Sequence, residues 1–386
     1  MRSRRSGHPR SESEPADARS GLLEEVAITA GVGSLLQVDP SGVEAFLRLA
    51  AQKEVDACDI ESFLQLPPNS RMASALSHTD VDLARVFRLG LLHDSTLGES
   101  AAEDPMAQRM AEAVRFAREQ RERVAELLTS VREGLSPESI VRRVREYLPC
   151  ETSTPAARIT LLVGLAQGMQ SGGDLLIDLP LALILRPRDP LGNLGDTIAH
   201  ELHHYWRESL EPEPHSDDAR FRGIAWALEQ LEGEGIAMAL VDAGDDPCMG
   251  ILRDAEGMVR FFGEAARDVI EGWTAIYKGG HVAALARLEK AWDGVLEGSV
   301  GAEGAVECVL SVLDQNTDHP VGHMMAHRIG KALGRAALVQ CVRRPFLFLR
   351  TYQRAARQSV DGAPAHVFDD RIIQRLAESV FPEVAT

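Results

Sequence analysis

The chain has 386 residues, of which 45% are hydrophobic and 26% are charged, so it is long enough to bury a core as one large domain or two ordinary ones. Its formal net charge is −17, which argues against nucleic acid and anionic membranes as partners, because both are negatively charged. Only 5% of the residues are aromatic, which predicts a core of Ala, Leu and Val and favours helix.

Residues 1–20 are rich in Arg, Ser and Pro and are expected to form a disordered lead. The SRR sequence within them, followed by the mildly apolar VAITAGVGSLLQV, leaves a twin-arginine export signal open as an alternative, although Glu24 and Glu25 interrupt it and no clear cleavage site follows. No apolar run approaches the roughly 20 residues that cross a bilayer. Five cysteines stand singly and indicate reduced thiols: Cys58, Cys150, Cys248, Cys308 and Cys341. The sequence therefore predicts a cytoplasmic protein.

Residues 21–150 are predicted to form a helical N-terminal region. The stretch 107–135 carries Leu and Val on one side and charged residues elsewhere, which is typical of one long helix or two. Ser136 is the expected N-cap of the next helix, with Pro137 in its first turn.

Residues 151–386 are predicted to form a second domain, which opens with two short apolar runs at 157–168 and 172–185. These runs are the only convincing strand pair in the sequence. Further helices are expected at about 194–209, 222–243, 251–278, 281–297 and 300–315, and through the block 319–358. The predicted fold class is mainly α with a small β-sheet (α+β).

The first of these later helices contains the motif HExxH, formed by His200, Glu201 and His204. Residues four apart lie one turn above each other, so His200 and His204 can bind one ion, while Glu201, about 100° around the helix, can reach a water beside it. The predicted apolar stripe, about 140° from the histidine pair, consists of Leu194, Ile198, Leu202 and Tyr205. His203 falls on neither face and is expected to face solvent or to lie behind the ligands. Because a bare HExxH occurs in many unrelated chains, a polar helix face with incidental histidines remains the alternative.

A catalytic zinc ion needs a third protein ligand. The extended HExxHxxGxxH pattern fails here, because Arg207 and Leu210 stand where it requires Gly and His. His215, in a Pro-rich loop, is a weak candidate. Glu234 is favoured over Glu232 because its helical neighbours are apolar, a setting in which a solvated carboxylate would be out of place. The alternative is that Glu229, Glu232 and Glu234 all line an exposed face.

Taken together, His200, Glu201, His204 and the sequence EGIA beginning at Glu234 resemble the gluzincin zinc metallopeptidases, and in particular uncharacterised bacterial families of zinc-dependent peptidases. The resemblance covers about residues 157–243. It implies a zincin-like fold with a helical C-terminal lobe, and an edge strand that binds extended peptide. The chain departs from thermolysin-like members at Met238, where they carry a bracing Asp; Asp196 is a substitute candidate for that role.

A second group of histidines, His319, His323 and His327, also has four-residue spacing. By the same resemblance, His319 or His323 would stabilise the oxyanion of the tetrahedral intermediate, with Tyr277 and Tyr352 as lesser candidates. A second metal site, or a surface or packing role, are the alternatives.

The sequence thus predicts a peptidase with one Zn²⁺ ion held by His200, His204 and Glu234. Glu201 is the expected general base, and a peptide or protein is the expected substrate. Two alternatives stay open: a zinc hydrolase of non-peptide amides or esters, and a non-catalytic protein that uses zinc for binding or assembly.

Overall fold

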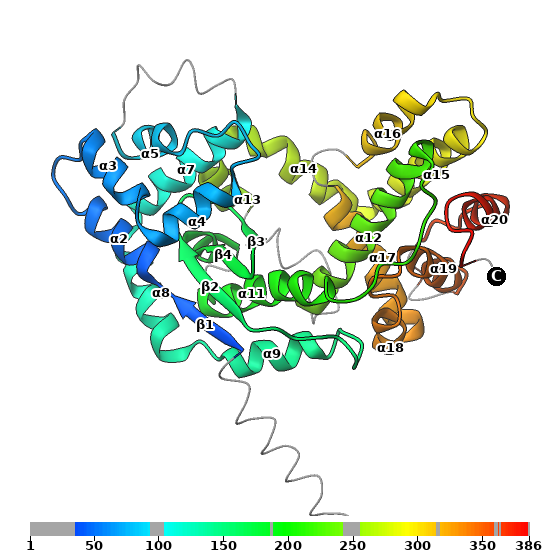
Figure 1. Ribbon diagram of the computed structural model, residues 1–386, viewed down its shortest axis with the longest axis horizontal. Coiled ribbons are helices and arrows are strands. Elements are labelled where there is room, and N and C mark those ends of the chain that lie inside the picture. The colour runs from blue at the N-terminus through cyan, green and yellow to red at the C-terminus, as the bar shows by residue number, and fades with distance from the viewer. Residues whose placement is uncertain are drawn as a thin grey trace, which may run out of the picture.

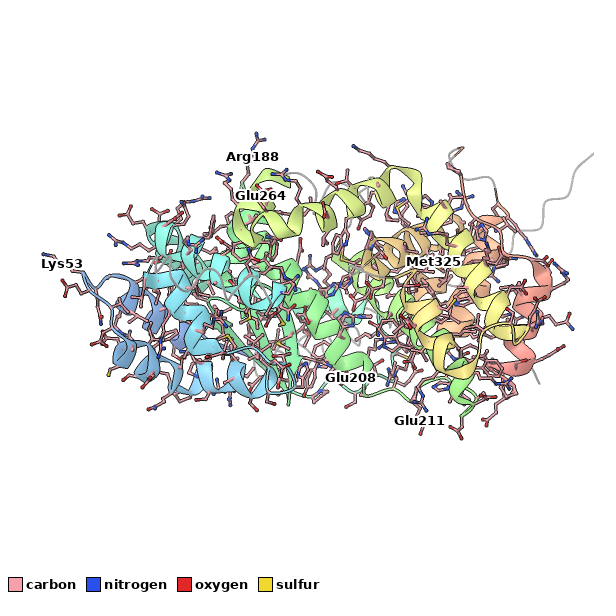
Figure 2. All side chains as sticks on the ribbon, turned by 90° about the horizontal axis from the view of Figure 1, so that it is seen from above. Lys53, Arg188, Glu208, Glu211, Glu264 and Met325 are labelled. Atoms are coloured by element: carbon pink, nitrogen blue, oxygen red, sulfur yellow. The ribbon has the colours of Figure 1, made fainter. Side chains whose placement is uncertain are left out.

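The computed structural model describes residues 35–92, 104–185, 188–241, 255–313, 317–358, 362 and 364–384. The predicted lead at residues 1–20 and Cys248 lie outside these ranges. Figure 1 shows a half that contains the sheet and the N-terminal helices, a half made of C-terminal helices, and α11 and α12 between them. In Figure 2, Lys53 and Arg188 project from the surface, whereas Met325 lies inside the C-terminal half. No helix within the described ranges is long and apolar enough to span a membrane.

A mixed four-stranded sheet is the β part of the fold, so the prediction of a mainly α chain with a small sheet is confirmed. Its strands, in spatial order, are β1 (Leu36–Asp39), β2 (Ala157–Leu162), β4 (Asp174–Asp178) and β3 (Gly168–Ser171). β2 is parallel to both β1 and β4, and β3 pairs antiparallel with β4. Consecutive residues of β2 and β4 are buried, so both faces of the sheet are covered, and β3 forms one edge.

Two predictions about the strands are wrong in detail. Residues 21–150 are predicted to form a helical region, yet β1 lies within it, with Leu36 paired to Ala157. Four residues are too few to show a periodicity, and the partner strand lies far along the chain. The run 172–185 is a strand only as far as Asp178; it continues as η2 (Leu179–Leu181) and α10 (Ala182–Leu185). Pro180 has no backbone N–H for a central strand, and a continuous apolar run does not by itself distinguish strand from helix.

Seven helices lie in the described part of the chain between β1 and β2, and they account for most of the predicted helical region. They are α2 (Ser41–Ala50), α3 (Ala57–Leu64), α4 (Pro67–Ala75), α5 (Leu83–Leu92), α7 (Pro105–Glu119), α8 (Arg121–Gly134) and α9 (Pro137–Arg145). The stretch 107–135 is two helices rather than one. The predicted N-cap is confirmed, because the Ser136 hydroxyl accepts the N–H of Ser139 at 3.3 Å.

The part after the sheet is helical, as predicted. Its helices are α11 (Pro190–Arg207), α12 (Arg222–Val241), α13 (Ala255–Phe262), α14 (Arg267–Ala275), α15 (His281–Leu296), α16 (Ala302–Leu310), α17 (Asp318–Leu333), α18 (Arg335–Val339), α19 (Pro345–Ala356) and α20 (Asp370–Ser379). Short turns of other helix types lie at η3 (Ala219–Phe221), η5 (Glu264–Ala266) and η6 (Ile276–Gly280). No helix was predicted from the sequence at the position of α20.

Helices α12 and α17 cross with their backbones in contact. A methyl group built on Gly322 would lie 2.4 Å from the carbonyl oxygen of Leu231, and one on Gly235 would lie 2.4 Å from that of Gly322. Only glycine allows this approach. The crossing brings the first turn of α17, with His319, against Glu234.

Gly322→Ala is therefore expected to lower the free energy of unfolding by about 1–3 kcal/mol, because the added methyl group overpacks the crossing. Gly330→Ala is the matched control on the same helix, since its methyl group would lie 3.6 Å from Leu338 Cδ1, an ordinary contact. Urea denaturation of the three proteins measures the difference. If the two substitutions had equal effects, the crossing would not be as tight as described.

Candidate metal centre

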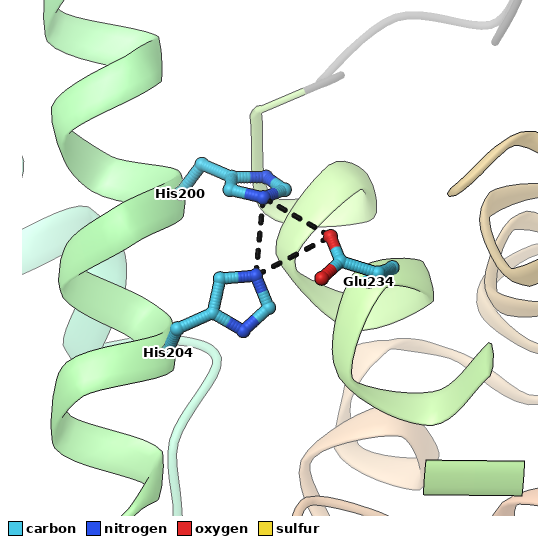
Figure 3. A group of neighbouring side chains, drawn as sticks. All are labelled: His200, His204 and Glu234. Atoms are coloured by element: carbon cyan, nitrogen blue, oxygen red, sulfur yellow. Dashed lines mark hydrogen bonds and ion pairs between the residues drawn. The ribbon is translucent and has the colours of Figure 1, made fainter. Parts of the chain in front are cut away.

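The apolar stripe of α11 anchors the motif helix in the core, as the sequence predicted. Leu194, Ile198 and Leu202 are fully buried, and Tyr205 packs against the same core. The helix starts at Pro190, where the Asp189 side chain accepts the N–H of Gly192 at 3.0 Å. With this stripe fixed, the histidine pair on the other side of α11 is partly exposed and points toward α12 (Figure 3).

The side chains of His200, His204 and Glu234 converge on one point (Figure 3). The two Nε2 atoms are 3.1 Å apart, and Glu234 Oε2 lies 3.2 Å from that of His200 and 3.4 Å from that of His204. Among the described residues, these three form the only group of His, Cys, Asp and Glu whose ligand atoms all lie within 4.8 Å of one another. His215, the weak alternative, is exposed on its loop and is not part of the group.

The spacing of the three atoms fits a tetrahedral zinc ion. Zn–N and Zn–O distances near 2.0–2.1 Å place neighbouring ligand atoms about 3.3–3.4 Å apart. Glu234 Oε2 is buried, and no described donor points at it with hydrogen-bond geometry. Burial alone would raise the pKa of Glu234, but the nearby His204 and His319 outweigh it and hold the pKa well below its usual range. The donor set of two imidazoles and one carboxylate is one that catalytic zinc uses.

The Glu201 carboxylate lies between the motif helix and the edge strand. A methyl group on Gly168, the first residue of β3, would lie 2.6 Å from Glu201 Oε1. The loop that leads into β3 is held by Asp178, whose carboxylate accepts the N–H of Ala166 at 2.7 Å. Burial of the carboxylate raises the pKa of Glu201 to about 7, although His200 acts in the opposite direction. Glu201 is therefore a candidate proton acceptor beside the three converging side chains.

His319 approaches the same carboxylate from α17. Its Nε2 lies 3.1 Å from Glu234 Oε2, and its Nδ1 lies 3.1 Å from Oδ1 of Asp318. The ring stacks on Trp273 of α14, with centroids 5.5 Å apart. Burial lowers the pKa of His319, but Glu234 and Asp318 outweigh it and raise the pKa to about 9. His319 is thus an oriented cation at the edge of the site.

His323, one turn further along α17, differs in setting from His319. It is buried, and its Nδ1 lies 3.0 Å from the Tyr277 hydroxyl. Burial lowers the pKa of His323 to about 3, which keeps the ring neutral. Neither His323 nor His327 belongs to a group with metal-ligand spacing among the described residues. Tyr352 is buried in the C-terminal core against Phe368, apart from these contacts.

His203 was expected to face solvent or to lie behind the ligands, and the solvent-facing expectation is wrong: its exposed fraction is 0%. It lies seven residues after Asp196, on the same flank of α11. Arg143 of α9 packs along this flank and donates to the Asp196 carboxylate and, at 3.0 Å, to the carbonyl of Gly195. The cover of α9 explains the burial, which lowers the pKa of His203 well below its usual range.

The alternative that the glutamates of α12 line an exposed face is also wrong. Glu232 is fully buried and forms an ion pair with Arg207, the residue that ends α11. Sequence reasoning missed this pair, because Arg207 was considered only as a departure from the extended motif. The signal available in the sequence was that Arg207 follows His204 by three residues and Glu232 precedes Glu234 by two. An ion pair between them would join the two helices that carry the predicted ligands.

Comparison with known proteins gives one result that bears on function. The family described as "Putative zinc dependent peptidase (DUF5700)" matches residues 60–361, which include α11, α12 and α17. No curated protein and no solved structure matches the chain. Because the match extends over well more than half of the sequence, the chain belongs to this family.

Proposed function

We propose that this protein is a gluzincin-type peptidase with a zincin-like fold, in which His200, His204 and Glu234 hold one zinc ion. The observation that carries the proposal is the convergence of three ligand atoms 3.1–3.4 Å apart. The family description supports zinc dependence and peptidase activity at a coarser level. A zinc ion bound here would polarise the scissile carbonyl and lower the pKa of a water molecule to about 7.

Glu201 is the general base in this proposal. Its carboxylate takes a proton from the attacking water and passes it to the leaving amine. A pKa of about 7 suits both steps, because a group that titrates near the working pH can accept and return a proton. The carboxylate lies beside Gly168 at the edge of the sheet, where a substrate can lie.

An extended peptide is the substrate that this edge can bind. β3 pairs only with β4 among the described strands, so it is an edge to which a further strand could add. A peptide that lies along Gly168–Ser171 would pass directly beside Glu201. Main-chain pairing of this kind would position the scissile bond largely independently of the substrate's side chains.

His319 is the better of the two candidates for stabilising the oxyanion. Its side chain is 29% exposed, and Asp318, which is not a proposed zinc ligand, orients it and raises its pKa. His323 is buried and neutral, and its contact with Tyr277 suits a supporting role. A cationic donor aimed at developing negative charge is the usual source of such stabilisation.

The proposal is tested by measuring metal content and peptide cleavage in one preparation. We expect about one zinc per chain, cleavage of a peptide library read by mass spectrometry, loss of cleavage on chelation, and recovery with zinc but not with magnesium. If the protein binds zinc but cleaves only model esters or non-peptide amides, the alternative of a zinc hydrolase with non-peptide substrates would be favoured. Zinc without any hydrolysis would favour a binding or assembly protein.

A further inference from the structure

The two helices that carry the proposed ligands are joined by the buried ion pair of Arg207 and Glu232. Arg207 ends α11 three residues after His204, and Glu232 lies two residues before Glu234 on α12. Arg207 donates through Nη2 to Glu232 Oε2, and its Nε lies 3.5 Å from Oε1. The Glu232 side chain has no exposed surface and that of Arg207 is 10% exposed, so the pair is removed from solvent.

The Arg207 guanidinium lies across the side of α12 between the two glutamates. A methyl group on Gly233 would lie 3.2 Å from Arg207 Cζ, so the planar group rests on the helix at the one residue between Glu232 and Glu234. These two glutamates are about 200° apart around the helix. Rotation of α12 that turned Glu234 away from the histidines would therefore also displace Glu232 from the guanidinium.

Glu232 is fixed from a second direction by the turn between α18 and α19. The N–H of Arg343 donates to Glu232 Oε1 at 3.0 Å, and Arg343 has a φ of 63°, in the left-handed region that few non-glycine residues adopt. The same turn is held by Glu213, whose Oε2 accepts the N–H of Phe346 at 2.6 Å and whose own N–H donates to the Arg343 carbonyl at 3.0 Å. The carboxylate that Arg207 contacts is therefore held in place independently of Arg207.

We propose that Arg207 and Glu232 are positioning residues, which set the rotation of α12 against α11 so that Glu234 faces His200 and His204. The inference rests on the proposed zinc site. A buried ion pair contributes little net stability, because desolvation of the two charges offsets their attraction. Its effect should therefore appear in the geometry of the ligands, and in zinc affinity, more than in the stability of the metal-free fold.

The double variant Arg207→Met/Glu232→Gln tests the proposal in the full chain. It leaves no unpaired buried charge, and the new carboxamide can still accept the Arg343 N–H. We expect the metal-free protein to melt near the temperature of the parent, and the zinc Kd, measured by competition with a chromophoric chelator, to rise about 10–100-fold. A Kd within twofold of the parent would overturn the proposal.

The matched control is Arg132→Met/Glu44→Gln, which removes an exposed Arg–Glu ion pair between α8 and α2 and should leave the zinc Kd unchanged. If the double variant does not fold, Arg207→Lys tests the proposal in its place, because it keeps the positive charge and loses the planar guanidinium over Gly233. We expect its zinc Kd to rise about tenfold, and an unchanged Kd would overturn the proposal. Failure of the parent chain to bind zinc would instead contradict the proposed function, and the inference with it.

Discussion

Glu201→Gln is expected to reduce kcat/KM for peptide hydrolysis by about 10²–10⁴-fold while the zinc content stays at the level of the parent. The amide has nearly the shape of the carboxylate, so it can keep the packing against Gly168, but it cannot take a proton from water. Glu201 is also outside the group with metal-ligand spacing, so its replacement leaves the three proposed ligands in place.

Glu229→Gln is the control for this loss, because Glu229 lies on α12 and is partly exposed, and it is not among the proposed ligands. Its kcat/KM should match that of the parent. Metal analysis and initial rates on a peptide found in the library digest give both quantities from the same samples. A Glu201→Gln protein that hydrolyses peptides as fast as the parent would show that another group is the base.

His204→Ala and Glu234→Ala are each expected to abolish stoichiometric zinc binding. Each substitution removes one of three protein ligands. Loss of a residue that only supports a ligand can raise the zinc Kd by up to about 100-fold, so loss of a ligand itself should raise it further. Hydrolysis should fall with the bound zinc. In Glu234→Ala, the loss of the shared carboxylate also leaves His200, His204 and His319 without their common partner.

His215→Ala is the matched control for the histidine variant, since His215 is exposed and its Nδ1 contacts only the carbonyl of Ser216 among the described residues. Equilibrium dialysis against buffered zinc, with metal analysis of the retained protein, measures the affinities. Full zinc occupancy in His204→Ala or in Glu234→Ala would show that the ligand assignment is wrong.

Much of the site could be predicted because it depends on local periodicity. Four-residue spacing on a helix placed His200 and His204 on one side and the apolar stripe on the other, and the three aliphatic residues of the stripe are fully buried. Glu234 was singled out by the apolar residues around it. In the structure it is the glutamate of α12 that faces the histidines, while Glu232 turns to Arg207.

What could not be predicted depends on contacts between segments far apart in the sequence. The burial of His203 follows from α9, which lies about 60 residues earlier, and the ion pair of Arg207 with Glu232 becomes visible only when α11 and α12 are side by side. β1 is too short for a pattern and forms because β2 offers it a partner. The close crossing of α12 and α17 likewise depends on Gly235 and Gly322 lying against each other. Neither residue's place in the sequence indicates that the other is its contact.

The pairing of β1 with β2 has a consequence for where this protein can be divided. The family match starts at residue 60, whereas the sheet beside the site contains residues 36–39. Without β1, the apolar strand β2, which now lies inside the sheet, would become an exposed edge. Exposed apolar edge strands pair with other chains and lead to aggregation. The limits of the family match and the limits of the sheet therefore do not coincide in this protein, and we expect a fragment that starts at residue 60 to be less stable and more prone to aggregation than one that also includes β1.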